Sequence, residues 1–96
     1  MPNVNKEIIN LRADIDKLDQ KILKLLKQRI HVTQKIGKIK KSTRSNILDT
    51  QRESEIFTNL LAAGENLKIK DDFIISLWRQ IIEYSYKVQN DCDLER

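Results

Sequence analysis

The sequence is poor in residues that interrupt helices and in residues that fill large cores. It has one proline and two glycines, and it shows no strand pattern, internal repeat or low-complexity segment. Aromatic residues make up only 5% of the chain, so the core of an isolated monomer of this size would be thin. We expect a single small all-α domain over residues 1–96.

The sequence also lacks the marks of export and of membrane insertion. Its one cysteine, Cys92, cannot form a disulfide within the chain, which is typical of a reducing compartment. No apolar run approaches membrane-spanning length, and the start, MPNVNKEIIN, has no signal-peptide core. We therefore expect a cytoplasmic protein. No phosphate-binding loop, metal-ligand cluster or nucleophile–base pair is found, so its chemistry need not involve a metal or a covalent intermediate.

A regular apolar stripe runs through residues 5–41. Its members recur at spacings of mostly three and four residues: Ile8, Leu11, Ile15, Leu18, Ile22, Leu25, Val32, Ile36 and Ile39. This repeat predicts one helix, roughly 50 Å long at about 1.5 Å per residue, that packs lengthwise against partner helices. A compact monomer of this size is narrower than that, so we expect an oligomer whose chains share a core.

Arg29 takes the stripe position between Leu25 and Val32, where an apolar residue is expected. A guanidinium there needs an anion, either a carboxylate that sets the helix register or a bound ligand. Lys40 lies within roughly 20° of the same face and about 16 Å further along, so the two cations can bracket a small dianion. Arg12 lies roughly 25 Å before Arg29 and could join them only from an antiparallel second copy. Taken alone, Arg12 and Lys40 also fit ordinary solvated charges.

A second helix is expected over about residues 50–63, opened by Asp49 or Thr50 and closed by Gly64. Its inner face comprises Ile56, Phe57, Leu60 and Leu61. Thr50-x-x-Glu53 fits a capping box, in which the glutamate serves only the helix start. Alternatively, Arg52 and Glu53 stand one turn before the apolar face and point inward as a charged pair at the edge of the core.

A third helix is expected over about residues 72–90, capped by Asp71 and Asp72. Its apolar stripe comprises Ile74, Leu77, Trp78, Ile81, Ile82 and Val88. Ser85 and Gln89 extend this stripe, either as hydrogen bonders between helices or as the lining of a polar pocket in the bundle. Trp78 is expected in the core, and His31, which is off the stripe of the first helix, at the surface.

The net charge of +4 and the pI near 9.3 permit an anionic partner. Nucleic-acid binding would require a basic stripe on an exposed face. Here the notable cations lie in the apolar seam, and acidic residues are mixed through the wet faces. A basic helical dimer that binds nucleic acid or acts as a scaffold is therefore the weaker interpretation.

Eight positions together resemble the active-site set of the all-helical, AroQ-type chorismate mutases: Arg12, Arg29, Lys40, Asp49, Arg52, Glu53, Ser85 and Gln89. The resemblance runs from LRADIDKLDQKILKLL through VTQKIGKIK and LDTQRE to IIEYSYKVQ, with no insertion or deletion. It implies three helices per chain in an intertwined antiparallel homodimer. Arg12 would then reach the partner's site, and the other seven residues would line their own chain's site.

The reaction implied is the pericyclic rearrangement of chorismate to prephenate in phenylalanine and tyrosine biosynthesis, which needs no cofactor. Such a step requires binding of the reactive conformer and stabilisation of charge on the ether oxygen. By resemblance, Arg12 and Arg29 grip the two substrate carboxylates, with Arg52 as support. Lys40 and Gln89 donate to the ether oxygen from opposite sides.

By the same resemblance, Glu53 takes the substrate hydroxyl with Asp49 nearby, and Ser85 contacts a carboxylate. The four residues expected to be catalytic are Lys40, Gln89, Arg29 and Glu53. Whether Asp49 and Arg52 touch the substrate or orient a neighbour stays open. An isochorismate-pyruvate lyase of the same fold is the nearest alternative function, and a non-catalytic relative of the mutases is another.

Overall fold

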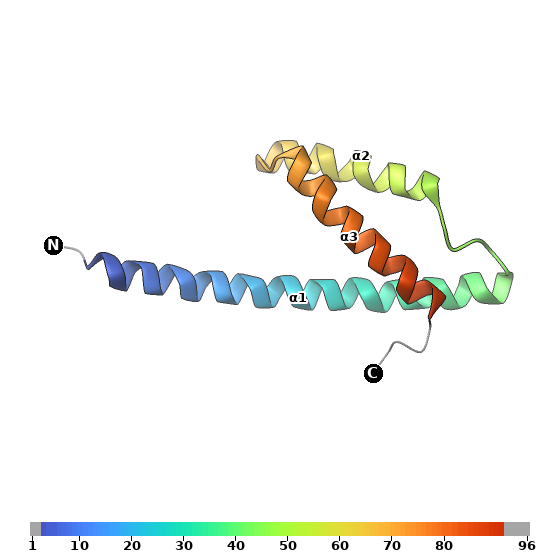
Figure 1. Cartoon of the computed structure of the whole chain (residues 1–96), viewed down its shortest axis with the longest axis horizontal. Coiled ribbons are helices and arrows are strands. Elements are labelled where there is room, and N and C mark those ends of the chain that lie inside the picture. Colours follow the sequence, from blue (N-terminus) through green and yellow to red (C-terminus); the bar gives the residue numbers. More distant parts are fainter. Residues whose placement is uncertain (1–2, 92–96) are drawn as a thin grey trace. The chain divides into compact units, whose positions relative to one another are not determined.

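The structure, a computed structural model of the chain, describes residues 3–91. It has three helices, α1 (Val4–Thr43), α2 (Thr50–Leu67) and α3 (Asp71–Asn90) (Figure 1). Residues 3–91 contain no strand. The predicted all-α chain with a long, a short and a medium helix is confirmed. Cys92 and the rest of the polar tail lie outside the described residues.

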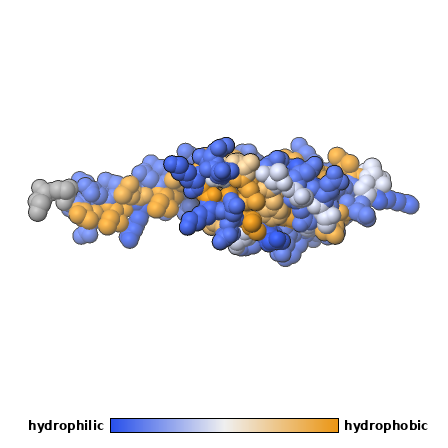
Figure 2. Space-filling view, turned by 90° about the horizontal axis from the view of Figure 1, so that it is seen from above, coloured by the Kyte–Doolittle hydropathy of each residue, from blue (hydrophilic) through white to orange (hydrophobic). Residues whose placement is uncertain are grey.

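The chain forms two compact units, one up to Val32 and one from Thr33 onward. In the first unit α1 begins beside Asn3, whose side-chain oxygen accepts from the Lys6 N–H at 3.1 Å. The apolar stripe of this unit, from Ile8 to Val32, keeps 40–62% of its surface exposed. Figure 2 shows hydrophobic side chains in a row near the N-terminal end. A lone amphipathic helix gains little stability until this face is covered.

The second unit holds its core among the end of α1, α2 and α3. The buried residues on α1 are Thr33, Gln34 and Gly37, and those on α3 are Ile74, Ile82, Ser85, Val88 and Gln89. The predicted inner face of α2 is half-buried along its whole length. On α3, Trp78 is half-buried and Leu77 stays 37% exposed. The core of this unit is small and contains several polar side chains, which is typical of a helical bundle with an internal polar site.

Within the second unit, α1 approaches α3 most closely at Gly37. A Cβ added at Gly37 would lie 2.8 Å from the Cα and 2.9 Å from the carbonyl oxygen of Gln89. Those atoms belong to the backbone of a helix and cannot rotate away. The late glycine of the first helix therefore sets how closely α1 meets α3 at Gln89.

The second helix is longer than predicted, because Gly64 does not end it. Gly64 is buried inside α2, where a Cβ would overlap the end of the Ile74 side chain on α3. The helix continues to Leu67 and is capped by Lys68, which adopts the left-handed conformation with φ 59°. The Ile69 N–H then donates to the Gly64 carbonyl at 2.9 Å. The glycine lies where α2 packs against Ile74 of α3, and the prediction that it stops the helix is wrong.

The start of α3 also differs from the prediction. Lys70 is the capping residue, in an extended conformation and with no side-chain cap bond. Asp71 and Asp72 lie in the first turn, where their charges favour the positive end of the helix dipole. They stabilise the helix start by charge, so their predicted role as caps is wrong.

None of the helices within residues 3–91 is long and apolar enough to span a membrane.

Candidate active site

The start of α2 is built by Asp49 rather than by Thr50. Asp49 Oδ1 accepts from the Arg52 backbone N–H at 2.9 Å, and its carbonyl accepts from the Glu53 N–H at 3.1 Å. Thr50 is the first helical residue, so the predicted Thr50–Glu53 capping box is wrong. Because Asp49 caps the helix, the Glu53 carboxylate is available for other contacts.

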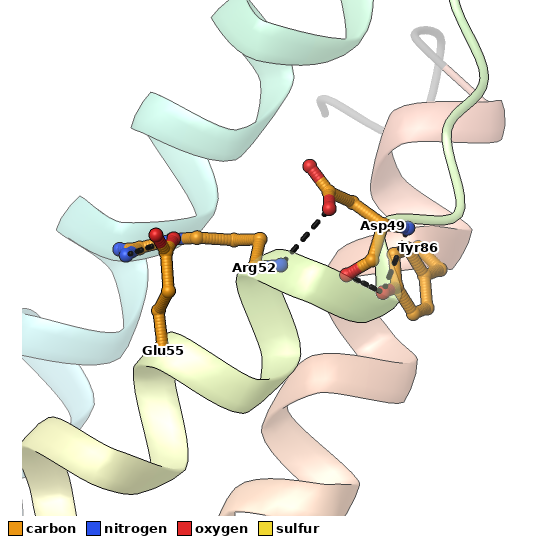
Figure 3. Close-up of polar contacts among 4 residues, drawn as sticks. All are labelled: Asp49, Arg52, Glu55 and Tyr86. Atoms are coloured by element: carbon orange, nitrogen blue, oxygen red, sulfur yellow. Dashed lines mark hydrogen bonds and ion pairs between the residues drawn. The ribbon is translucent and has the colours of Figure 1, made fainter.

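The side chains of Arg52 and Glu53 diverge. The Arg52 guanidinium pairs with Glu55 Oε1 at 3.5 Å (Figure 3). The Arg52 side chain is 60% exposed. Glu53 is half-buried. The expectation that Arg52 points inward is therefore wrong in this structure, and the expectation for Glu53 is confirmed.

Tyr86 on α3 contacts both Asp49, the N-cap of α2, and Glu53 in the first turn of α2. Its hydroxyl lies 2.5 Å from Glu53 Oε2, 3.3 Å from the Asp49 nitrogen and 3.4 Å from the Asp49 carbonyl oxygen. Figure 3 shows the phenol reaching from α3 to Asp49 at the start of α2. Burial, and secondly the hydrogen bond to Glu53, raise the pKa of the Tyr86 hydroxyl above its ordinary value. At neutral pH the phenol is therefore protonated and able to donate.

Sequence reasoning missed Tyr86, which no apolar stripe includes. Its partners lie 33 and 37 residues earlier in the chain, so no local pattern points to the contact. The available signal was its position between Ser85 and Gln89, both of which were singled out. A phenol on the same turn as two candidate site residues carries a donor into the same region.

Lys40 lies at the end of α1 and is half-buried. Its ammonium donates to the Ile47 carbonyl at 2.9 Å, across the linker that leads to α2. An ammonium has three N–H donors, so two remain for another acceptor. The backbone turns away from α1 at Arg44, which has φ 55°. This turn places the positive end of Lys40 beside the linker that ends at Asp49.

Ser85 and Gln89 are buried, with 9% and 7% of their surfaces exposed. Ser85 Oγ donates to the Ile81 carbonyl at 2.9 Å, one turn back on α3. Gln89 lies against Gly37 of α1, and Lys40 follows Gly37 by three residues, on the same side of that helix. Gln89 and Lys40 are thus carried by helix segments that are in contact.

The second unit carries six of the eight predicted site residues: Lys40, Asp49, Arg52, Glu53, Ser85 and Gln89. Arg12 and Arg29 belong to the first unit, where Arg12 is exposed and Arg29 half-buried. Within residues 3–91 no group of three or more His, Cys, Asp or Glu side chains is placed to hold a metal ion. The donors of the second unit are an ammonium, an amide and hydroxyls, which suit an anionic, oxygen-rich organic molecule.

Polar side chains gathered inside a helical unit are typical of all-helical proteins that bind small ligands between their helices. A family model described as chorismate mutase type II matches residues 11–90. The chain therefore belongs to the chorismate mutase type II family. The matched segment contains all eight positions predicted for the site, from Arg12 to Gln89.

Individual relatives agree with the family. The chain is 32% identical over 85 residues to a bifunctional chorismate mutase/prephenate dehydratase of Buchnera aphidicola, covering 88% of this chain and 22% of that protein. The corresponding protein of Escherichia coli K12 is 30% identical over 82 residues, covering 85% and 21%. A chorismate mutase of Methanocaldococcus jannaschii is 25% identical over 84 residues, covering 88% and 85%. The chain thus spans about a fifth of the bifunctional relatives and most of the archaeal one.

Proposed function

We propose that this chain is a chorismate mutase that rearranges chorismate to prephenate, a step of aromatic amino acid biosynthesis. The observation that carries the proposal is the family match over residues 11–90, which contains every predicted site position. The archaeal relative named chorismate mutase adds support, because the match covers 85% of it. A segment of this length is therefore enough to make up most of a protein with that name.

The reaction breaks one C–O bond and forms one C–C bond in a single step. The protein's task is to hold the substrate in its folded conformer and to stabilise the negative charge that develops on the ether oxygen. In the proposed site Lys40 and Gln89 donate to that oxygen. The contact between their helix segments at Gly37 and the free N–H donors of Lys40 support this assignment.

The remaining roles follow from the chemistry of each side chain. Arg12 and Arg29 bind the substrate carboxylates through paired N–H donors, and Ser85 contacts one of them. Glu53 accepts a hydrogen bond from the substrate hydroxyl. Asp49 supports Glu53 as the N-cap of α2, in agreement with the hydrogen bond that Asp49 Oδ1 accepts from the Arg52 N–H. Arg52, 60% exposed beside Glu55, is a supporting residue in this proposal.

The proposed active form is a homodimer in which the first helices run antiparallel and each chain donates Arg12 to its partner's site. The exposed apolar row of α1, with 40–62% of its surface open between Ile8 and Val32, supports this arrangement. Covering such a row stabilises each chain by about 25 cal/mol per Å² of apolar surface removed from water. The cytoplasmic location stays a prediction from the sequence.

The proposed activity is tested with the purified chain and chorismate. We expect chorismate to disappear and prephenate to be the product, identified by chromatographic separation from the isomeric chorismate and by its acid conversion to phenylpyruvate. Parallel incubation with isochorismate tests the lyase alternative, which would release pyruvate. Pyruvate from isochorismate without prephenate from chorismate would replace the proposed function with the lyase.

Replacing Gln89 with glutamate is expected to move the activity optimum to acid pH. An amide donates at any ordinary pH, whereas a carboxyl donates only when protonated. At neutral pH we expect kcat/KM to fall by about 10²–10³-fold, the usual effect of losing one donor to a developing oxyanion. The rate should recover as pH falls. Gln80→Glu, an exposed change on the same helix, is the control and should keep the wild-type pH–rate profile. An unchanged profile for Gln89→Glu would remove the contact with the ether oxygen.

A further inference from the structure

We propose that Tyr86 is a positioning residue, which holds the Glu53 carboxylate and the start of α2 in the orientation that receives the substrate hydroxyl. The proposal rests on the function proposed above. It assigns no contact between Tyr86 and the reacting atoms. Its effect on the reaction passes through Glu53.

The distances show which way the phenol donates. Tyr86 Oη has one hydrogen, and three acceptors or donors surround it. The 2.5 Å separation from Glu53 Oε2 is typical of a hydroxyl that donates to a carboxylate, whereas the 3.4 Å separation from the Asp49 carbonyl is long for such a bond. The oxygen also lies 3.3 Å from the Asp49 nitrogen, whose N–H donates to it. Tyr86 therefore donates to Glu53 and accepts from Asp49, and so ties α3 to the first turn of α2.

This tie matters because Glu53 has a flexible side chain. A glutamate at the edge of a core can point its carboxylate in several directions through three rotatable bonds. The neighbouring guanidinium of Arg52 is engaged with Glu55, on the exposed side of α2. The phenol fixes Glu53 Oε2, and a carboxylate has about four lone-pair sites, so the other oxygen can still accept a substrate hydroxyl.

The hydrogen bond between Tyr86 and Glu53 also links the site residues at the start of α2 to those on α3. Tyr86 stands one residue after Ser85 and three before Gln89, on the α3 segment that meets α1 at Gly37. Because both residues lie on one turn of α3, the helix fixes the position of Tyr86, which binds Glu53, relative to Gln89. Burial and the hydrogen bond to Glu53 raise the pKa of the Tyr86 phenol above its ordinary value, in agreement with a phenol that donates its proton to that carboxylate.

The experiment is Tyr86→Phe, which removes the hydroxyl and keeps the ring. We expect kcat/KM for chorismate to fall about 10-fold, the loss expected when one charge-assisted hydrogen bond is removed. The loss should appear mainly as a higher KM, because the substrate hydroxyl takes no part in the bond changes. The thermal midpoint should fall by no more than about 10 °C, so both proteins are compared at a temperature at which circular dichroism shows them to be folded. Tyr84→Phe is the matched control, since Tyr84 is 47% exposed on the same helix, and it should keep wild-type kinetics.

A double-mutant cycle with Glu53→Ala separates a positioning role from an independent one. If Tyr86 acts through Glu53, Tyr86→Phe should change kcat/KM less than about 2-fold once Glu53 is alanine. Equal factors in both backgrounds, a loss confined to kcat, or wild-type kinetics in Tyr86→Phe would each overturn the inference while leaving the mutase function intact. A higher kcat/KM in Tyr86→Phe would show that the phenol competes with the substrate, and would overturn it too. Wild-type protein that leaves chorismate unchanged would overturn both proposals.

Discussion

Replacing Gly37 with alanine is expected to lower both the stability and the proposed mutase activity of the protein. The new Cβ would lie 2.8 Å from Gln89 Cα and 2.9 Å from its carbonyl oxygen, so α1 and α3 must move apart. Overpacking of this kind costs about 1–3 kcal/mol and is only partly offset by the better helix propensity of alanine, about 1 kcal/mol. We expect the midpoint of thermal unfolding to fall by about 4–8 °C for each kcal/mol lost.

The activity of Gly37→Ala should fall further than its stability suggests. Separation of the helices displaces Gln89 from Lys40, and a misplacement of about 1 Å at a reacting group can cost 10²-fold in rate. The measurement is kcat/KM for chorismate at a temperature at which circular dichroism shows the variant to be folded. Wild-type kcat/KM in a folded Gly37→Ala would show that the approach of α1 to Gln89 has no part in catalysis.

Gly64→Ala is the matched control, a second buried glycine inside a helix of the same unit. There the added Cβ meets the end of the Ile74 side chain, which can change rotamer at a cost of about 0.5–1.5 kcal/mol. The gain in helix propensity, about 1 kcal/mol, is of the same size. We therefore expect a thermal midpoint near that of wild type and unchanged kinetics. A loss as large as that in Gly37→Ala would point to a general intolerance of this unit to added volume.

The parts of the fold that the sequence predicts are those governed by periodicity. The stripe from Ile8 to Ile39 spans about nine turns of α1, so many residues agree on one answer. The inner face of α2 and the burial of Ser85 and Gln89 follow from the same counting. In each case the side chain's place depends only on its position along one helix.

The sequence fails where a residue's role depends on a partner in another helix. Gly64 looks like a helix stop, but its small size makes room for Ile74, ten residues further on. The helix ends at Lys68, which adopts a left-handed conformation. This position has neither the glycine nor the asparagine that usually marks such a conformation. Lysine rarely takes that conformation, so composition gives no warning of it.

The candidate site shows the same division. The family-like spacing identifies Glu53 and Asp49, but two chemically reasonable caps stand side by side at Asp49 and Thr50. The choice between them is made by geometry at the helix start, and the contact with Tyr86 comes from a residue 33 positions after Glu53. A tertiary hydrogen bond of this kind leaves no periodic trace. Arg52 is a different case, because its ion pair with Glu55 is local to α2. This ion pair competes with an inward position of the Arg52 side chain.

Arg12→Ala and Arg29→Ala are each expected to be nearly inactive as homodimers and to complement each other when mixed. Loss of one cation that is desolvated and hydrogen-bonded in the proposed complex costs about 2–5 kcal/mol, so each variant should lose about 30-fold or more in kcat/KM. Both arginines lie on α1, 17 residues apart, roughly 25 Å along the axis, so a single copy of α1 cannot bring both to one small substrate. An antiparallel partner helix can.

Chain exchange between equal amounts of the two variants should restore about a quarter of wild-type activity, because about half of the dimers are mixed and each has one site with both arginines. On heterodimers isolated through two different affinity tags, kcat/KM per dimer should reach about half of the wild-type value, because one of the two sites is intact. Lys40→Ala mixed with Arg29→Ala is the control, since both residues are expected to line their own chain's site and every mixed dimer then has two damaged sites. No recovery in verified Arg12→Ala/Arg29→Ala heterodimers would exclude an Arg12 donated by the partner, and recovery in the control would show that Lys40 and Arg29 do not line the same chain's site. Recovery in the test pair alone would assign the two ends of α1 to different active sites of one dimer.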